Sequence, residues 1–433
     1  MTTAVRVLDV FNVSPPPFCV PKEPQQLTFL DVFWFPISPV QRIFFYNPLE
    51  QESNFSDLVD KLKNSLSLVL EYFYPLAGKI ALSADSEHLE IHYKDGDGVA
   101  FYVAETEVDY EALVTSRAHD TTIFKLLVPP LSARFPAPMV SVQATGFPDG
   151  GLCIGVSFNH GAADGRGFIS FVKAWAEVCR SGGLSSHPNH DRSVLRDPGR
   201  LSKWYVDWYK ISKEGVGLFP EFPKLNDLVI ATFLIGKDGI ARLKRQATSS
   251  GSAVPSTFAA VSAHIWVCTA RARNLGDDSM LVYAFPADGR SQLKPKVTDQ
   301  YFGNCVYSCI AKGTGRELKG KEPLVWAAEA IGSVIREGRA DPFGGAKTWL
   351  SQFTELVGTG FLSVAGSPRF GVYETDFGWG RPRRVEVVSI DKEGGIALSE
   401  ARDEEGGVQV SLSLRSSEMH QFESLFFKGL NDA

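Results

Sequence analysis

The sequence lacks the features that mark secreted, membrane-spanning and nucleic-acid-binding proteins. Its first 24 residues hold only short apolar stretches, broken by polar residues and a Pro15–Pro17 run, so we expect no secretory signal. The longest apolar stretch elsewhere, 228–235, has eight residues, far fewer than the ~20 that cross a membrane. The formal net charge is -6, and no long basic run is present. We therefore expect a cytoplasmic protein with a small-molecule substrate and neither a nucleic acid nor a membrane as partner.

Cysteine is scarce and scattered. The six cysteines include no Cys-x-x-Cys pair, which argues against a disulfide framework and against a structural zinc site. No His-Glu-x-x-His motif is present to start a zinc hydrolase. We expect no bound metal and a reducing compartment.

Length and composition favour two domains of mixed α/β structure. The chain has 433 residues, of which 44% are hydrophobic, enough for more than one core. Hydrophobic spacing predicts helices at 56–73, 167–180, 257–273 and 323–339 and strands at 88–93, 140–144, 152–158, 281–286, 384–389 and 408–414. Between residues 181 and 200 the sequence becomes rich in Ser, Gly, Pro and charge, as in a crossover between domains. The predicted division is 1–185, a crossover at 186–212, and 213–433.

A histidine follows the strand predicted at 152–158. His160 stands in the turn Asn159-His160-Gly161-Ala162-Ala163-Asp164, between that strand and a helix. Such turns lie at the carboxyl edge of a sheet, where α/β folds keep their sites. An imidazole near its usual pKa of ~6.5 can take a proton from an attacking hydroxyl and return it to a leaving group. A hydrogen-bonded structural histidine is the alternative.

Asp164 has two roles open to it. An aspartate just before a helix is a good N-cap. An ionised aspartate at a sheet edge is stabilised by a cationic partner. Arg290, which follows the strand predicted at 281–286, is the partner we expect. The same His-x-x-x-Asp spacing recurs at His187 and Asp191, but we interpret this second match as chance because no strand precedes it and no helix follows.

Taken with a second motif, the histidine turn resembles the plant BAHD acyltransferases. That family carries His-x-x-x-Asp in mid-chain and Asp-Phe-Gly-Trp-Gly near the C-terminus, as at 376–380 here. The stretches 73–78 and 262–266 agree with the family, and 301–305 and 398–403 resemble its anthocyanin, flavonoid and phenolic glucoside branch. The resemblance covers nearly the whole chain. It implies two chloramphenicol-acetyltransferase-like domains, each with a mixed sheet flanked by helices, and a solvent channel between them.

The resemblance also implies an activity. His160 would act as general base on the acceptor hydroxyl, which attacks the thioester of an acyl-CoA co-substrate, with no permanently bound cofactor. The implied donor is malonyl-CoA or a hydroxycinnamoyl-CoA, and the implied acceptor is a glycosylated flavonoid, anthocyanin or phenolic glucoside. A monomer is expected. Another alcohol or amine acceptor, a peptide-bond-forming condensation domain and a non-catalytic binder of the same fold remain alternatives.

Further site residues are assigned by position and by charge. Asp164 is expected to support the catalytic turn, Asp376 to have a supporting role, and Cys305 to be a buried thiol rather than a nucleophile. The segments 376–380 and 301–305 are expected to support the channel structurally, with direct contact to substrate as the alternative. The residues predicted to bind substrate are Phe33, Trp34, Phe35, Arg166, Tyr301 and Trp379, and those predicted to bind CoA are Ser256, Thr257 and Arg290. A guanidinium at Arg166 suits the free carboxylate of a malonyl group, whereas Phe168 and Phe171 would suit a hydroxycinnamoyl donor.

Overall fold

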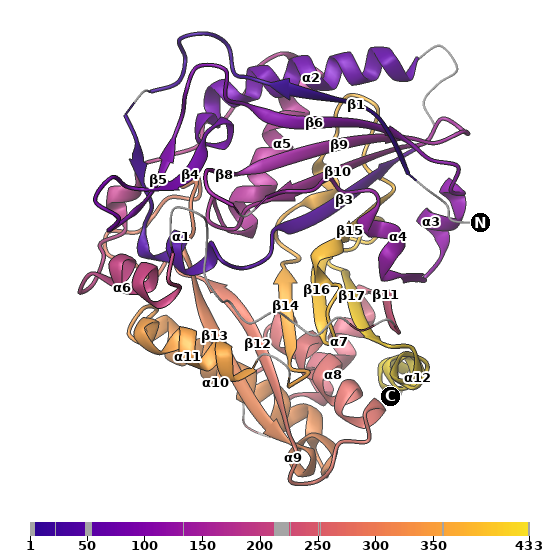
Figure 1. Cartoon of the computed structure of the whole chain (residues 1–433). Coiled ribbons are helices and arrows are strands. Elements are labelled where there is room, and N and C mark those ends of the chain that lie inside the picture. Colours follow the sequence, from indigo (N-terminus) through magenta and orange to yellow (C-terminus); the bar gives the residue numbers. More distant parts are fainter. Residues whose placement is uncertain are drawn as a thin grey trace.

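Two large mixed sheets and one small sheet organise the chain, as Figure 1 shows for the computed structural model. The structure describes residues 5–21, 23–47, 54–132, 134–211, 225, 227–249, 251, 253–356 and 359–431. Its strands are β1 (Arg6–Val13), β2 (Gln25–Gln26), β3 (Val40–Tyr46), β4 (Lys79–Leu82), β5 (Leu89–His92), β6 (Val99–Glu105), β7 (Ala118–Asp120), β8 (Ala137–Pro138), β9 (Val140–Gly146), β10 (Leu152–Phe158), β11 (Leu228–Ile235), β12 (Met280–Asp288), β13 (Val306–Thr314), β14 (Leu362–Gly366), β15 (Arg384–Val387), β16 (Gly395–Glu400) and β17 (Val408–Arg415).

Helices cover these sheets. The α-helices are α1 (Phe29–Trp34), α2 (Phe55–Tyr72), α3 (Tyr110–Thr115), α4 (Thr121–Lys125), α5 (Gly165–Ser181), α6 (Leu201–Trp208), α7 (Lys237–Gln246), α8 (Thr257–Ala272), α9 (Gly315–Lys319), α10 (Pro323–Ala340), α11 (Ala346–Leu356) and α12 (Ser416–Asn431). The 3-10 helices are η1 (Tyr74–Ala77), η2 (Arg192–Val194), η3 (Val372–Glu374) and η4 (Val388–Ile390). Within the described ranges, every helix is too short or too polar to span a bilayer.

The two large sheets exchange strands between the two halves of the chain. The first has six strands in the order β1-β6-β9-β10-β3-β15, so its last strand comes from the second half of the sequence. The second has seven strands in the order β13-β12-β14-β16-β17-β11-β7, and its last strand comes from the first half. Figure 1 shows β15 beside β3, at the edge of the first sheet nearest the second sheet. The four-stranded sheet, β2-β5-β4-β8, lies wholly in the first half. The predicted boundary between residues 212 and 213 lies outside the described residues.

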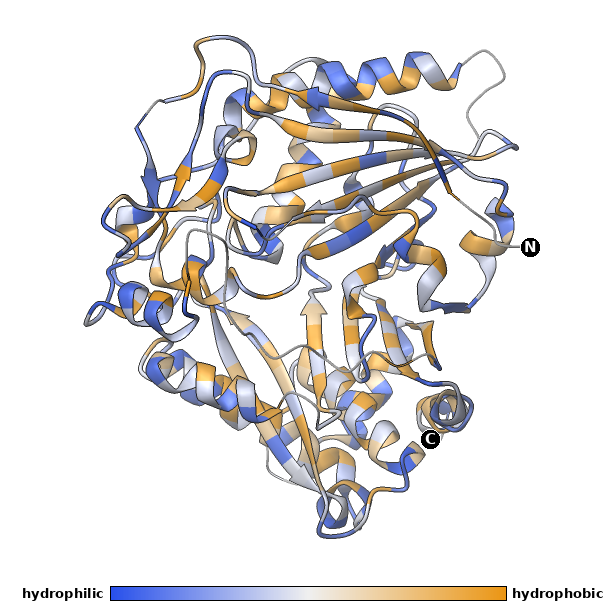
Figure 2. Cartoon of the chain, viewed as in Figure 1, coloured by the Kyte–Doolittle hydropathy of each residue, from blue (hydrophilic) through white to orange (hydrophobic). Residues whose placement is uncertain are grey.

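The periodic segments of the sequence form the elements predicted for them. The helix predicted at 56–73 is α2, and its buried residues include Leu58, Leu62 and Leu66 on the predicted face. Figure 2 shows hydrophobic and hydrophilic residues alternating along α2, whereas hydrophobic residues dominate the strands. The helix predicted at 167–180 is α5, which packs beside α2 against the first sheet. The strand predicted at 384–389 is shorter, because β15 ends at Val387 and η4 follows.

Strand β10 runs through the middle of the first sheet and carries the chain to the predicted histidine turn. All seven of its residues are buried, not only the four on the predicted face, because β9 and β3 flank it and both faces are covered. The second face is closed by the chain after α4. A Cβ on Gly155 would lie 1.9 Å from the carbonyl oxygen of Leu127, so only glycine fits there. Close packing on both faces fixes the end of the strand, and with it the turn.

Candidate active site

The turn after β10 places His160 in the wall of a large cavity. The cavity has a volume of about 3080 Å³, and its walls come from both halves of the chain. The turn itself is held by two bonds from Asn159, whose carbonyl accepts from the Ala162 N–H at 2.9 Å and whose side-chain oxygen accepts from the Gly161 N–H at 2.9 Å. His160 is partly buried and lines the cavity. The accessible imidazole that the sequence predicts is therefore present.

A buried amide fixes the orientation of the His160 ring. Nδ1 lies 3.1 Å from Oδ1 of Asn304. The Asn304 side-chain nitrogen donates to the His160 carbonyl at 2.8 Å and to Asp31 Oδ1 at 2.9 Å, so its oxygen must be the end that faces the ring. An amide oxygen only accepts, so Nδ1 carries the proton. The lone pair available for catalysis is then on Nε2.

The carboxylate of Asp31, which accepts from the Asn304 amide, also has other partners. Asp31 is fully buried, and its Oδ2 accepts from the N–H and the hydroxyl of Thr28 and, at 3.0 Å, from Nε of Arg192. Thr28 and Asp31 form the capping box that starts α1. Asn304, Asp31 and Arg192 were not among the predicted site residues. The Thr-x-x-Asp spacing predicts a helix start but says nothing of a contact 273 residues away.

Burial lowers the pKa of His160 below its ordinary value. Its ring stacks on Trp34, with centroids 4.7 Å apart and planes 17° from parallel. Loss of water disfavours the imidazolium more than the neutral ring. At neutral pH the side chain is therefore an uncharged imidazole that can accept a proton.

The predicted ion pair between Asp164 and Arg290 is present. Arg290 Nη1 lies 2.8 Å from Asp164 Oδ2, and both side chains are almost fully buried. Asp164 also accepts from the N–H groups of Gly167 and Cys305, so it caps α5 and ties it to the other half of the chain. Burial alone would raise the pKa of Asp164, but the Arg290 charge and these hydrogen bonds hold it below its usual value. Asp164 thus fixes the catalytic turn, and Arg290 has no free charge for CoA.

The three adjacent aromatic residues at 33–35 point in different directions. Trp34 meets His160 at the cavity, while Phe33, also at the wall, packs on Tyr205 and Trp349. Phe35 is 2% exposed and stacks on a phenylalanine of the chain before β8. Phe35 is therefore part of the core and not of the cavity wall.

Tyr301, Asp376 and Trp379 also lie away from the cavity wall. Tyr301 is 1% exposed. Asp376 accepts the N–H groups of Gly378 and Gly380, which closes the 376–380 turn, and Trp379 stacks on Phe377 beneath α2 and α5. Packing uses both rings and neither residue lines the cavity, so the contact of Tyr301 or Trp379 with substrate stays a prediction. Asp376 supports its own turn.

Three of the remaining predicted residues line the cavity, and Cys305 is buried. Ser256 and Thr257 line the cavity at the start of α8, where the Ser256 hydroxyl caps the helix. Arg166 also lines it, but it pairs with Asp288 and Asp299. Cys305 is fully buried, and burial raises the pKa of its thiol to about 12, which suits a structural thiol.

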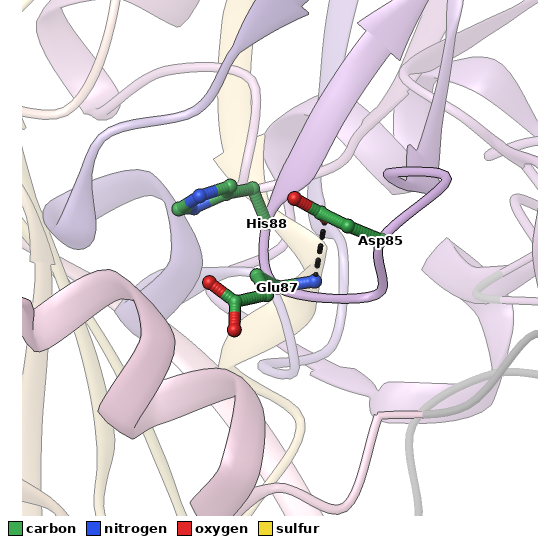
Figure 3. Close-up of side chains that lie close together, drawn as sticks. All are labelled: Asp85, Glu87 and His88. Atoms are coloured by element: carbon green, nitrogen blue, oxygen red, sulfur yellow. Dashed lines mark hydrogen bonds between the residues drawn. The ribbon is translucent and has the colours of Figure 1, made fainter.

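One group of side chains has the spacing of metal ligands. Asp85, Glu87 and His88 lie close together in the loop between β4 and β5, as Figure 3 shows. Asp85 accepts from the Ser83 hydroxyl and the Glu87 N–H, and Glu87 pairs with Arg200. Local hydrogen bonds and ion pairs account for the cluster, which lies outside the cavity wall.

Comparisons with known proteins agree with this arrangement. The model of the Transferase family matches residues 18–428. Phenolic glucoside malonyltransferase 1 of Arabidopsis thaliana is 35% identical, over 100% of this chain and 99% of the relative. The malonyl-coenzyme:anthocyanin 5-O-glucoside-6'''-O-malonyltransferase of Salvia splendens is 33% identical, over 98% of this chain and 96% of the relative. Among solved structures, vinorine synthase superposes with a TM-score of 0.76 at 22% identity, covering 97% of this chain and 98% of its own.

Proposed function

Because the chain belongs to the Transferase family of acyl-CoA-dependent acyltransferases, we propose that it moves a malonyl group from malonyl-CoA to a sugar hydroxyl of a phenolic glucoside. The relatives' names support the donor and the acceptor class, since malonyltransferases of phenolic and anthocyanin glucosides match it over nearly its full length. The observation that carries the proposal is a neutral imidazole, fixed in one tautomer, at the wall of a cavity.

The proposed chemistry needs one proton carrier. Nε2 of His160 takes the proton of the acceptor hydroxyl as its oxygen attacks the thioester carbonyl, giving a tetrahedral intermediate. The carbon–sulfur bond then breaks, and the CoA sulfur takes the proton back from His160, so that ester and free thiol leave and the enzyme returns to its starting state. General-base catalysis of this kind contributes about 10²–10⁴-fold. Positioning of the two substrates supplies much of the rest.

The cellular setting is also part of the proposal. The cavity is complete within one chain, since its walls come from both halves of the same molecule, which supports a monomer. All six cysteines are free, and five of them are buried, which suits the reducing cytoplasm.

The direct test is a coupled measurement on the purified protein. Incubation with malonyl-CoA and a flavonoid glucoside should release free thiol and yield the malonylated glucoside, one acyl group per thiol, as measured by thiol titration and mass spectrometry. Thiol release at the same rate without the glucoside would instead indicate a hydrolase. No release with malonyl-CoA or coumaroyl-CoA would indicate a binder of the same fold. The predicted alternative acceptors, other alcohols and amines, are included in the acceptor panel.

A further inference from the structure

One buried arginine in the cavity wall pairs with no carboxylate of the residues that the structure describes. Arg42, on β3, lines the cavity with only 3% of its surface exposed. Its guanidinium makes no hydrogen bond or ion pair with any residue in the described part of the chain, and its Nε is fully enclosed. A buried charge without a partner is costly. The other arginines buried to this degree, by contrast, each hold a carboxylate: Arg192 with Asp31, Arg290 with Asp164, and Arg384 with Glu386.

The surroundings of Arg42 leave room on the cavity side. Its guanidinium carbon lies 6.0 Å from the centre of the Phe168 ring, at the start of α5. Its Nη2 reaches β14 in the other sheet, where a Cβ on Gly366 would lie only 3.6 Å away. The arginine thus spans the junction of the two sheets, and the absence of a side chain at Gly366 leaves space beside its terminal nitrogens.

Two carboxylates lie near Arg42 without pairing with it. Glu386 is occupied by Arg384, Thr232 and Ser411. Glu400 accepts the N–H of Tyr373 at 2.9 Å through Oε1. Burial lowers the pKa of Arg42 to about 10, with both carboxylates opposing the shift, so the side chain is still charged at neutral pH. A charged guanidinium that pairs with no carboxylate of the described residues has the chemistry to bind an anionic group.

The position of Arg42 along the sheet matches the length of a short diacid. Arg42 pairs with Val156 across β3 and β10, four residues before His160. At about 3.3 Å per residue, that backbone position is about 13 Å from the base, a span that an arginine side chain and a three-carbon acyl group cover together. Arg166, the arginine that the sequence favoured, is already paired with Asp288 and Asp299.

From these observations we propose that Arg42 binds the free carboxylate of the malonyl donor and thereby selects malonyl-CoA over acyl-CoA donors without a terminal charge. The inference rests on the proposed transfer from acyl-CoA and adds the residue that distinguishes between donors. Glu400 also lines the cavity, and its Oε2 has no hydrogen-bond partner among the described residues. Its negative charge makes it no ligand of the donor carboxylate in this scheme.

The test compares two donors that differ only in the carboxylate. We expect Arg42→Gln to lower kcat/KM for malonyl-CoA on the order of 30-fold more than kcat/KM for acetyl-CoA, as the loss of one charged hydrogen bond predicts. Arg42→Lys, which keeps the charge but not the fork, should recover part of the difference. The KM for the glucoside should not change in either variant.

Two further variants serve as matched controls. Arg166→Gln removes an arginine from the same cavity and should change kcat/KM for the two donors by the same factor. Glu400→Gln removes the carboxylate whose charge acts most strongly on Arg42 and should keep or increase the preference for malonyl-CoA. Thermal melting of each variant, and binding of both donors to a His160→Ala background by calorimetry, separate recognition from folding.

The results distinguish three roles for Arg42: recognition of the donor carboxylate, structural support, and binding of the acceptor. Two outcomes would show that Arg42 is structural. One is an unchanged preference for malonyl-CoA in Arg42→Gln; the other is an equal loss of kcat/KM for both donors, in Arg42→Gln and Glu400→Gln alike. Either would overturn the inference, while the proposal of malonyl transfer would stand. A loss confined to the KM of the glucoside would overturn it in favour of a sugar contact. If the wild-type enzyme transfers coumaroyl but not malonyl groups, the proposed donor fails first, and Arg42 loses this role with it.

Discussion

The two turns that carry the family motifs have different roles. The turn at 159–164 ends a buried strand and presents an imidazole to the cavity, and its polar groups are tied to the other half of the chain by Asn304 and Arg290. The turn at 376–380 also contains glycine, but its aspartate bonds its own backbone and its aromatic rings pack beneath α2 and α5. A recognisable motif can therefore mark chemistry in one place and packing in another, and only the contacts tell them apart.

Removal of the imidazole should give the largest effect. We expect His160→Ala to lower kcat about 10³-fold, because the proposed proton transfer has no other group to carry it. Urea unfolding should be unchanged, since the ring lies at the wall of the cavity. Full activity in this variant would remove the base from the mechanism.

Loss of the buried Asp164 carboxylate should lower the stability of the fold, and activity should fall only as a result. Asp164→Asn leaves Arg290 with an uncompensated buried charge, which should lower the free energy of unfolding by about 3–5 kcal/mol. Urea titration measures this change, and activity assayed at low temperature should fall with the folded fraction. Lost activity at unchanged stability would contradict the supporting role.

The amide behind the base should have an intermediate effect. Asn304→Ala frees the His160 ring to take the other tautomer, so we expect kcat to fall about 10–100-fold, as for other residues that orient a functional histidine, with the KM for acyl-CoA unchanged. Asn304→Asp adds a carboxylate beside Nδ1, which should raise the pKa of His160 and move the acid limb of the pH profile upward. A purely structural amide would leave that limb in place.

The second turn should respond in stability alone. Asp376→Ala removes the acceptor of two backbone N–H groups, which should cost about 1–2 kcal/mol of unfolding free energy. The kcat/KM of the folded enzyme should stay within about twofold of wild type. A tenfold loss of kcat/KM in a fully folded variant would show that the two turns are not different in kind.

The smallest expected effect concerns the pH at which kcat/KM falls on the acid side of the profile. The base must be neutral to act, and burial lowers the pKa of His160, so kcat/KM should be flat through neutral pH and fall only below the ordinary value of ~6.5. A pH–rate profile with a saturating acceptor checks this. An acid limb centred above that value would indicate that the ring is stabilised in its charged form.

The sequence predicts the local parts of this molecule better than its distant pairings. Strand β10, helices α2 and α5 and the histidine turn follow from hydrophobic spacing and small residues, which act over neighbouring positions. The ion pair of Asp164 with Arg290 was predicted because both residues follow strands and carry opposite charges. Asn304 behind His160 and the unpaired Arg42 were not predicted, because their roles depend on which groups do or do not meet them after folding. The substrate contact suggested for Trp379 rested on its motif, whereas packing in three dimensions decides what its ring touches.

The exchanged strands have a consequence for synthesis of the chain. Strand β15, which completes the first sheet beside β3, lies more than 200 residues downstream of every other strand of that sheet. During translation the edge of β3 therefore stays unpaired until nearly nine-tenths of the polypeptide has left the ribosome. An open strand edge is a template for association with other chains. A truncated product that stops before residue 384 retains this exposed edge, so incomplete chains should aggregate.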